Sequence, residues 1–209
     1  MARNSSEWIE RDLEGLVMDR IGEDVGLEYK RCASLKKEEA HKEEIGKDVS
    51  SFANSAGGVI VYGMKEDEAT HLPTELDDGY DPADISKEWL ENVIHTRIKP
   101  KITGLHINTV QLSGTKAGKV LYVVTIPPGT TAHQASDKKY YKRYNFKREA
   151  MEDYEIRDVM NRLKYPLVLP RFLSRFVDRS GTVYEYRLFT WLRNEGAMCA
   201  RDIKVVLTI

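Results

Sequence analysis

The sequence has few cysteines and no long apolar run. Cys32 and Cys199 are its two cysteines, and they stand far apart. They give no disulfide framework, and they cannot form a zinc site alone. The longest apolar stretches, such as residues 120–127, are too short to span a bilayer, and the N-terminus has no apolar signal core. We therefore expect a soluble, cytoplasmic protein without a membrane partner.

A large net charge is also missing. The formal net charge is −1, so the strongly basic total that many nucleic-acid-binding proteins show is absent. The charges are nevertheless segregated along the chain. Six of the eleven residues from 138 to 148 are basic and none is acidic, whereas acidic residues concentrate at 38–44 and 66–84. The local distribution of charge, rather than its sum, indicates which partners the surface attracts.

Several catalytic and cofactor motifs are missing as well. The nearest approach to a P-loop, at residues 114–120, is one residue short, ends in valine and falls in a predicted hairpin. ATP is therefore not expected as a cofactor. The five histidines show no paired spacing of the metalloprotease type, and no serine occupies a nucleophile elbow.

The hydrophobic pattern predicts a mixture of helices and strands. Apolar residues at helical spacing predict helices at residues 4–22, 36–55, 84–96 and 151–163. Alternating or apolar runs predict strands at residues 25–30, 59–63, 106–112, 119–127 and 139–144. The acidic residues 66–84 are expected to form a long surface loop. Together these elements predict an α/β fold in which helices flank a mixed β-sheet.

A boundary is predicted near residue 165, because two prolines fall between residues 165 and 170. We therefore expect a domain at residues 1–165 and a linker with a short C-terminal β segment at 166–209. Strands at 183–192 and 200–209 are predicted to pair around residues 194–196. Two strands do not make a stable domain alone. This segment is either the start of a truncated β-rich domain, or a hairpin that docks on the first domain or on another chain.

Four sequence stretches occur in the order typical of one family. They are L-E-Y-K at 27–30, V-S-S-F-A-N-S-A-G-G at 49–58, V-I-V-Y-G-M at 59–64 and Y-Y-K-R-Y at 140–144. Over about residues 7–165 the chain resembles the Schlafen AlbA_2 domain. The resemblance implies an α/β fold with a mixed sheet and a role in nucleic-acid binding. In the vertebrate Schlafen proteins tandem modules form a positively charged cradle, so a single module implies a homodimer.

The basic segment interleaves cations with aromatic residues. Cations neutralise phosphates, and aromatic faces stack on unpaired bases, so RNA or single-stranded DNA is the expected ligand of a basic groove. The predicted nucleic-acid-binding residues are Lys30, Lys47, Lys138, Lys139, Tyr141, Lys142, Arg143, Lys147 and Arg148. The alternative is an edge strand protected by lysines, with its tyrosines in the core.

The resemblance also implies an acidic nuclease site. Some Schlafen proteins cut transfer RNA with three acidic side chains and a divalent metal. Glu23 and Glu28 match two of these acids, and Glu66 or Asp67 matches the third. Glu23, Glu28 and Glu66 would hold Mg²⁺ or Mn²⁺ in an endoribonuclease. In the alternative interpretation Glu28 pairs with a lysine, Lys30 or Lys47, and the other acids are solvated.

Asn54, Gly57 and Gly58 follow the second predicted helix, where glycines commonly end a helix. We interpret these three residues as a structural turn. For the whole chain, nucleic-acid binding is the leading hypothesis and a metal-dependent endoribonuclease is the alternative. A regulatory or defence-related scaffold, which assembles partners without contacting nucleic acid, is the third.

Overall fold

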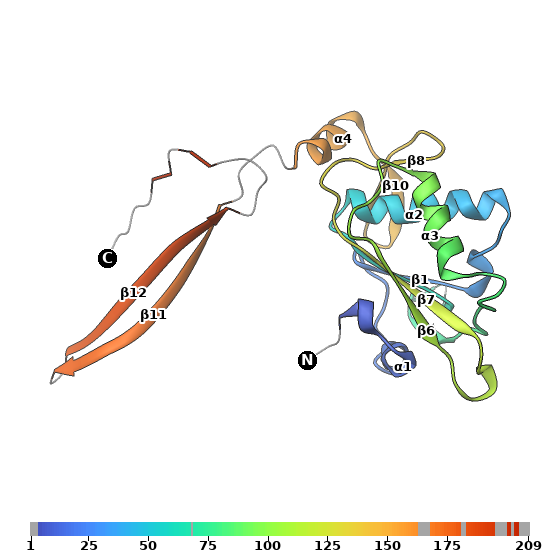
Figure 1. Ribbon diagram of the computed structural model, residues 1–209, viewed down its shortest axis with the longest axis horizontal. Helices are drawn as coiled ribbons and strands as arrows, with labels where there is room; N and C mark the ends of the chain where they lie inside the picture. Colours follow the sequence, from blue (N-terminus) through green and yellow to red (C-terminus); the bar gives the residue numbers. More distant parts are fainter. Residues whose placement is uncertain are drawn as a thin grey trace. The chain divides into compact units, whose positions relative to one another are not determined.

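The computed structural model describes residues 4–67, 69–162, 168–180, 183–194, 200–201 and 203–204. The chain divides into two compact units, Met1–Val159 and Met160–Ile209, which are described separately (Figure 1). None of the described helices is long and apolar enough to cross a membrane.

The first unit combines helices with short strands. Its helices are η1 (Ser5–Glu7), α1 (Glu10–Met18), η2 (Cys32–Ser34), α2 (Glu39–Asn54), α3 (Lys87–Arg97), η3 (Gly114–Lys116) and α4 (Asp153–Met160), whose last residue falls in the second unit. Its strands are β1 (Leu27–Lys30), β2 (Gly58–Tyr62), β3 (Met64–Glu66), β4 (Pro73–Leu76), β5 (Ile98–Lys99), β6 (His106–Gln111), β7 (Val120–Ile126), β8 (Gln134–Ala135), β9 (Tyr141–Tyr144) and β10 (Lys147–Ala150).

Four of these strands form the central sheet, in the order β1-β2-β7-β6. β1 runs parallel to β2, and the other neighbours are antiparallel. The predicted mixed sheet flanked by helices is therefore confirmed. β1 lies at one edge of this sheet, so its outer side has no strand partner in the described sheet and is open to side chains that do not serve the core.

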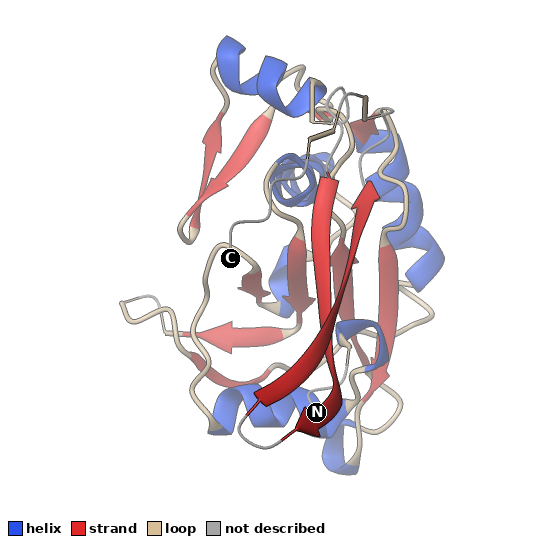
Figure 2. Cartoon of the chain, turned by 90° about the vertical axis from the view of Figure 1, so that its left-hand side faces the viewer, coloured by secondary structure: helices blue, strands red, loops and turns tan. Residues whose placement is uncertain are grey.

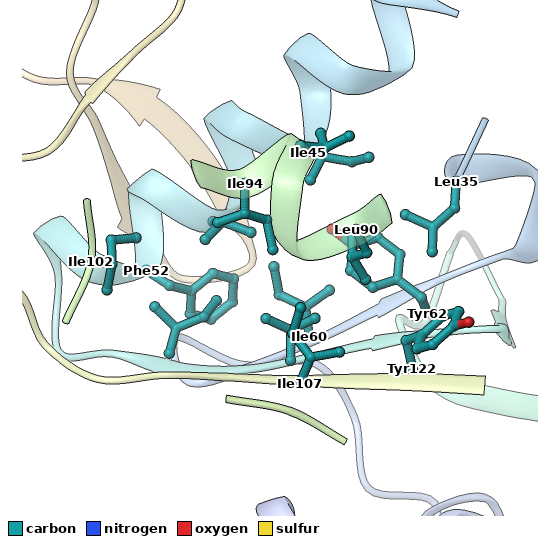
Figure 3. Close-up of a cluster of buried hydrophobic side chains, with 14 of the residues drawn as sticks. Leu35, Ile45, Phe52, Ile60, Tyr62, Leu90, Ile94, Ile102, Ile107 and Tyr122 are labelled. Carbon is teal, nitrogen blue, oxygen red and sulfur yellow. The ribbon is translucent and has the colours of Figure 1, made fainter. Parts of the chain in front are cut away.

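α2 and α3 cover one face of the sheet, and α1 covers the other (Figure 1). On the first face Phe52 of α2 and Leu90 of α3 pack with Ile60 and Tyr122 (Figure 3). All four side chains are almost completely buried. Burying each such side chain contributes about 1.5–3 kcal/mol, so this layer is the principal core.

The opposite face forms a smaller core under α1. Leu13 packs there with Tyr29, Val61 and Val123. Val61 and Val123 pair directly across β2 and β7, and they alternate with residues that face α2 and α3. The two-residue period of the strands thus divides one sheet between two cores.

Most predicted elements occur near their expected positions. Helices at 36–55 and 84–96 are confirmed as Glu39–Asn54 and Lys87–Arg97, and the hairpin at 106–127 is confirmed as β6–β7. The predicted helix at 151–163 spans Asp153–Met160, and residue 163 lies outside the described residues.

Two predictions in this unit were wrong. Residues 4–22 do not form one helix: Asn4 caps η1, and α1 begins only after the extended residue Ile9. The acidic stretch at 66–84 is not a single loop, because β3 and β4 pair as a short hairpin. An ion pair between Lys65 and Glu75, with 2.9 Å between Nζ and Oε1, spans these strands. Proline at the first position of β4 is compatible with a strand.

The second unit contains a long hairpin of β11 (Val168–Ser180) and β12 (Val183–Asn194). Figure 2 shows its two strands running side by side. The predicted strand at 183–192 is confirmed, and it pairs with β11, which was not predicted. Its expected pairing with 200–209 stays a prediction. Most of residues 200–209 lie outside the described residues, as do residues 163–167 of the predicted boundary. Pro170 lies within β11, an edge strand of the two-stranded ladder that the described residues form, where a residue without an N–H is tolerated.

Candidate functional site

The predicted acidic residues lie on different sides of β1. Leu27 and Tyr29 face the core under α1, so strand alternation directs Glu28 and Lys30 toward α2. Glu23 precedes the strand and approaches its open edge, where its Oε1 accepts a hydrogen bond of 2.7 Å from the backbone N–H of Tyr29. Glu23 and Glu28 are therefore held in separate surroundings, although they stand five residues apart.

Glu23 meets Glu66 and His71 in a small polar cluster, which we call the Glu23 pocket. His71 Nδ1 lies 3.7 Å from Glu23 Oε2 and 3.6 Å from Glu66 Oε2. One ligand atom from each of the three residues lies within 4.8 Å of the others. Glu66 Oε2 and His71 Nδ1 are buried atoms without a hydrogen-bond partner among the described residues. Two of the three residues therefore have a potential metal-ligand atom that makes no hydrogen bond to any described residue.

Burial of Glu23 raises the pKa of its carboxyl group to about 7, and the nearby Glu66 and Glu28 contribute in the same direction. The hydrogen bond from Tyr29 and the charge of Lys30 oppose this rise. Near neutral pH Glu23 is thus divided between its neutral and charged forms. A cation in the Glu23 pocket would favour the charged form, because it would balance two neighbouring carboxylates.

An aromatic side chain covers one side of this pocket. The ring of Phe146 stacks on the imidazole of His71, with 4.3 Å between ring centroids and 28° between planes. Phe146 lies in the turn between β9 and β10, and the ammonium group of Lys147 is 5.9 Å from its ring centroid. The β9–β10 hairpin, which we call the basic hairpin, therefore contacts the Glu23 pocket through its turn.

Glu28 lies in a different cluster, in which buried cations neutralise it. Arg143 Nη1 donates a hydrogen bond of 2.9 Å to Glu28 Oε2, and Lys30 Nζ lies 2.6 Å from Glu28 Oε1. The Arg143 side chain is 1% exposed, and its guanidinium carbon lies 4.6 Å from the ring centroid of Phe52. We call these residues, together with Asp48, the Glu28 cluster.

Asp48 brings a second carboxylate from α2 into this cluster. Its Oδ2 lies 3.5 Å from Lys30 Nζ, and Oδ1 accepts a hydrogen bond from Arg148. Burial raises the pKa of Asp48 to about 6, with Glu28 adding to the rise while Lys30 and Arg148 oppose it. Burial alone would lower the pKa of Lys30, but Asp48 and Glu28 outweigh it and raise this pKa. The cluster is a buried network of alternating charges.

Asp67 is engaged in hydrogen bonds within its own turn. Its Oδ1 accepts hydrogen bonds from the backbone N–H groups of Ala69 and Thr70, at 3.1 and 2.8 Å, and from the Thr70 hydroxyl at 2.8 Å. The Thr70 hydrogen bonds lower the pKa of Asp67. Asp67 therefore stabilises its own turn, and of the two alternatives for the third acid it is Glu66 that stands beside Glu23.

The predicted nucleic-acid-binding cations fall into two groups. The paired group is engaged with acids of the first unit: Lys30, Lys47, Lys142, Arg143 and Arg148. Lys142 pairs with Glu155, and Lys47 Nζ lies 2.9 Å from Glu44 Oε1. The open group is Lys138, Lys139 and Lys147, which are exposed and form no ion pair with any described residue.

Tyr141 and Asn54 connect the basic hairpin to α2. The Tyr141 hydroxyl donates to Asp137 Oδ2 at 2.6 Å, and the guanidinium of Arg148 lies 5.3 Å from the Tyr141 ring centroid. The buried Asn54 amide donates to the carbonyls of Tyr141 and His133 at 2.9 Å and accepts from the His133 N–H at 2.7 Å. Asn54 thus joins the end of α2 to two distant segments.

The two glycines after α2 are required by close backbone approaches. Gly57 has a φ of 77°, and a Cβ there would lie 2.5 Å from the carbonyl oxygen of Ile126. Gly58 has a φ of 152°, and a Cβ there would lie 2.5 Å from the carbonyl oxygen of Gly26. Both positions therefore exclude larger residues for reasons of backbone packing.

Sequence reasoning missed His71 and Asp48. His71 falls in the stretch predicted as a loop, and nothing in its spacing from Glu23 signals that the β3–β4 hairpin brings the two together. Asp48 gave a clearer signal, since it adjoins the apolar stripe of α2 that contains Ile45, Val49 and Phe52. A carboxylate at such a position requires buried partners.

Comparisons with known proteins place the chain in a family. The sequence model of the family described as Schlafen, AlbA_2 matches residues 23–152, well over half of the 209 residues. This family is associated with nucleic-acid-related functions. No curated protein matches the chain.

Among solved structures, the chain is similar to the DIP2311 protein from Corynebacterium diphtheriae, with 13% sequence identity and a TM-score of 0.48. The similarity covers 76% of this chain and 33% of that protein, so the chain spans about a third of the length of this neighbour. The family assignment therefore rests on the sequence match. The matched residues include the Glu23 pocket, the Glu28 cluster and the basic hairpin. The chain belongs to the Schlafen AlbA_2 family.

Proposed function

We propose that the chain binds nucleic acid, with RNA or single-stranded DNA as ligand, through the open group of Lys138, Lys139 and Lys147. The observation that carries this proposal is the division of the basic segment. The paired group has intramolecular acids, whereas the three open cations are exposed and have no ion pair with a described residue. Phosphates are the partners that would neutralise them, with release of counterions.

Exposed aromatic residues accompany these cations. Tyr144 is 59% exposed and Phe146 is 40% exposed, and Tyr144 pairs with Lys147 across the β9–β10 hairpin. Unpaired bases stack on such rings, and a stacked base contributes about 1–3 kcal/mol. Because a duplex offers few unstacked bases, this combination favours a single strand.

The paired cations have a supporting role in this proposal. Arg143 holds β9 against β1 through Glu28, and Arg148 holds β10 against α2 through Asp48 and Glu44. A phosphate contact by Arg143 stays a prediction, and it requires the ion pair with Glu28 to open. The same holds for Lys30, whose ammonium group is held by Glu28 and Asp48.

The test compares two triple variants of the full chain. Lys138→Ala with Lys139→Ala and Lys147→Ala removes the open group, and Arg11→Ala with Lys36→Ala and Lys87→Ala removes the same charge elsewhere. Affinity for labelled single-stranded RNA and DNA is measured across a salt series. We expect a loss of about tenfold or more in the first variant only, with a shallower salt dependence. Equal affinity of the two variants would exclude the hairpin as the contact surface.

A homodimer is part of the same proposal, because a second copy would double the number of open cations facing one ligand. Light scattering tests this proposal by measuring the molar mass of the chain in solution, with and without single-stranded nucleic acid.

The Glu23 pocket favours a second candidate function, a metal-dependent nuclease. Two carboxylates and an imidazole fit a divalent ion, and the imidazole favours Mn²⁺ over Mg²⁺. Glu23, Glu66 and His71 would hold the ion, which would activate water and stabilise charge on a phosphate. In this candidate Glu28 positions the strand through Arg143 rather than joining the ligands.

Metal binding tests this candidate independently of cleavage. Mn²⁺ titration followed by calorimetry should show a binding site that Glu66→Gln and His71→Gln each weaken by at least tenfold. Glu75→Gln, on the neighbouring strand, is the matched control. Cleavage of transfer RNA with Mn²⁺ and with chelator is then measured for the same variants. If the chain binds no Mn²⁺, the nuclease candidate fails, and the binding proposal is unaffected.

A further inference from the structure

The pairing of β11 with β12 sorts the hairpin's side chains onto two faces, because directly paired residues lie on the same side of a ladder. One side, which we call the arginine face, carries the pairs Leu169–Arg193, Arg171–Trp191, Leu173–Phe189 and Arg175–Arg187. All four arginines of residues 169–176 and 186–193 fall on this face, because successive side chains of a strand point to opposite faces.

The opposite face has a different chemistry. It carries the pairs Pro170–Leu192, Phe172–Thr190, Ser174–Leu188 and Phe176–Tyr186. The rings of Phe176 and Tyr186 meet edge to face, with 5.7 Å between centroids, as expected for paired residues on one side. These eight residues include no charged side chain, so the charge of this part of the hairpin is concentrated on the arginine face.

Three arginines of this face carry positive charge that no described acidic residue pairs with. Arg171, Arg175 and Arg187 are exposed, and none of them forms an ion pair with a described residue. Arg175 lies directly opposite Arg187, and like charges in this position destabilise a ladder. The acidic residues Asp178 and Glu185 oppose each other beyond the irregularity in β11. An anion bound across Arg175 and Arg187 would relieve their repulsion.

Large apolar side chains lie among these cations. Trp191 is 50% exposed and Phe189 is 44% exposed, and both lie between Arg187 and Arg193 in sequence. A row of phosphates alone would not require aromatic neighbours. Cations that flank exposed rings match a single strand, which offers phosphates and unpaired bases side by side.

We propose that the arginine face is a second nucleic-acid contact surface and that its ligand is a single strand. Arg171, Arg175 and Arg187 contact phosphates, and Trp191 and Phe189 stack on bases. The paired residues from 169 to 175 extend over about 20 Å at the usual rise of a strand. This inference rests on the proposed function, and it assigns part of the binding to residues outside the family match.

The test uses full-length variants with matched controls. Arg171→Gln with Arg175→Gln removes two cations, and Arg11→Gln with Lys36→Gln removes the same charge from the first unit. Trp191→Ala removes a ring from the arginine face, and Phe172→Ala removes one from the opposite face, where it is 62% exposed. The probes are labelled single-stranded RNA, single-stranded DNA, duplex DNA and vesicles of anionic lipid. Circular dichroism of each variant confirms that the chain is folded.

We expect both arginine-face variants to lose about tenfold in affinity for single strands, with the two controls close to wild type. Unchanged affinity in Arg171→Gln with Arg175→Gln would overturn this inference, and the proposed function would survive if the open-group variant were still impaired. If neither the arginine-face variants nor the open-group variant lost affinity for single strands, both this inference and the proposed function would be overturned. Loss of duplex binding without loss of single-strand binding, or loss confined to vesicles, would overturn the assignment of the ligand.

Discussion

Glu23 and Glu28 are five residues apart, yet they show two ways in which a protein holds a carboxylate away from water. Glu28 is enclosed by Arg143 and Lys30, so its charge is balanced inside the fold. Glu23 receives one backbone hydrogen bond and otherwise faces Glu66 and His71. The first arrangement is complete without a ligand, whereas the second has more carboxylate charge than the surrounding protein neutralises.

The difference indicates which acid serves structure and which is available for chemistry. A buried, fully paired carboxylate fixes the relative positions of the segments that carry its partners. Glu28 thereby connects β1 to β9, and Asp48 extends the connection to α2 and β10. A carboxylate with a raised pKa and unsatisfied neighbours is a stronger candidate for a functional site.

The largest effect is expected when Glu28 loses its partner. Arg143→Ala should lower the free energy of unfolding by about 3–5 kcal/mol, because it leaves a buried carboxylate without its guanidinium. Urea denaturation followed by circular dichroism measures this change.

Two further variants sharpen that result. Glu28→Gln in the Arg143→Ala background should recover part of the loss, since the uncompensated charge is then gone. Lys142→Ala removes a neighbouring cation whose pair with Glu155 is closer to solvent, and it should cost about 0–1 kcal/mol. Equal costs for Arg143→Ala and Lys142→Ala would contradict the view that the Glu28 cluster holds β9 in place.

Much of the fold could be predicted from the sequence, because the most deeply buried helices and strands also have the clearest periodic pattern of apolar residues. The apolar stripe of α2 and the run at 59–63 each indicated one structure. The failures occurred where polar residues predominate, since an acidic stretch such as 66–84 gives little sign that β3 and β4 will pair. The partner of β12 was also missed, because two prolines near residue 165 suggested a linker where β11 begins.

The candidate site was predictable only in part. Family resemblance selected Glu23, Glu28 and either Glu66 or Asp67, and the structure brings Glu23 and Glu66 together. Sequence spacing could not show that Glu28 is enclosed by Arg143, because the two residues are 115 positions apart. It also could not show which cations of the basic segment have internal partners, since those partners come from β1, α2 and α4.

A smaller effect is expected from the titration of Glu23. Its pKa is raised in the folded chain from 4.5 to about 7, so between these values the folded state binds more protons than the unfolded state. Stability therefore falls as pH rises through this window. After allowance for solvent screening, Glu23 should account for about 1–2 kcal/mol of this fall.

Thermal unfolding of the wild type and Glu23→Gln from pH 4 to 8 measures that contribution. Glu23→Gln should flatten the profile, and Mn²⁺ should reduce the loss above pH 6 in the wild type if the pocket holds a cation. Asp48→Asn is the comparison, because the raised pKa of Asp48, about 6, gives a fall of the same sign over a narrower range. Superimposable profiles for the wild type and Glu23→Gln would contradict the raised pKa.

The smallest effect is expected at the point where the basic hairpin contacts the Glu23 pocket. Phe146→Ala removes the ring stacked on His71, and an aromatic pair contributes about 0.5–1.5 kcal/mol. Tyr144→Ala is the matched control on the same hairpin, since Tyr144 is more exposed. Urea denaturation should give a larger loss for Phe146→Ala than for Tyr144→Ala, and calorimetry should show weaker Mn²⁺ binding only in Phe146→Ala. Equal losses in both variants would mean that the stack does not position His71, and the pocket would then depend on the β3–β4 hairpin alone. Phe146→Ala should therefore lower the free energy of unfolding much less than Arg143→Ala does. This pattern is expected if Glu28 anchors the basic hairpin and the hairpin makes only one contact with the Glu23 pocket. The pocket can then adjust to a ligand without unfolding the hairpin.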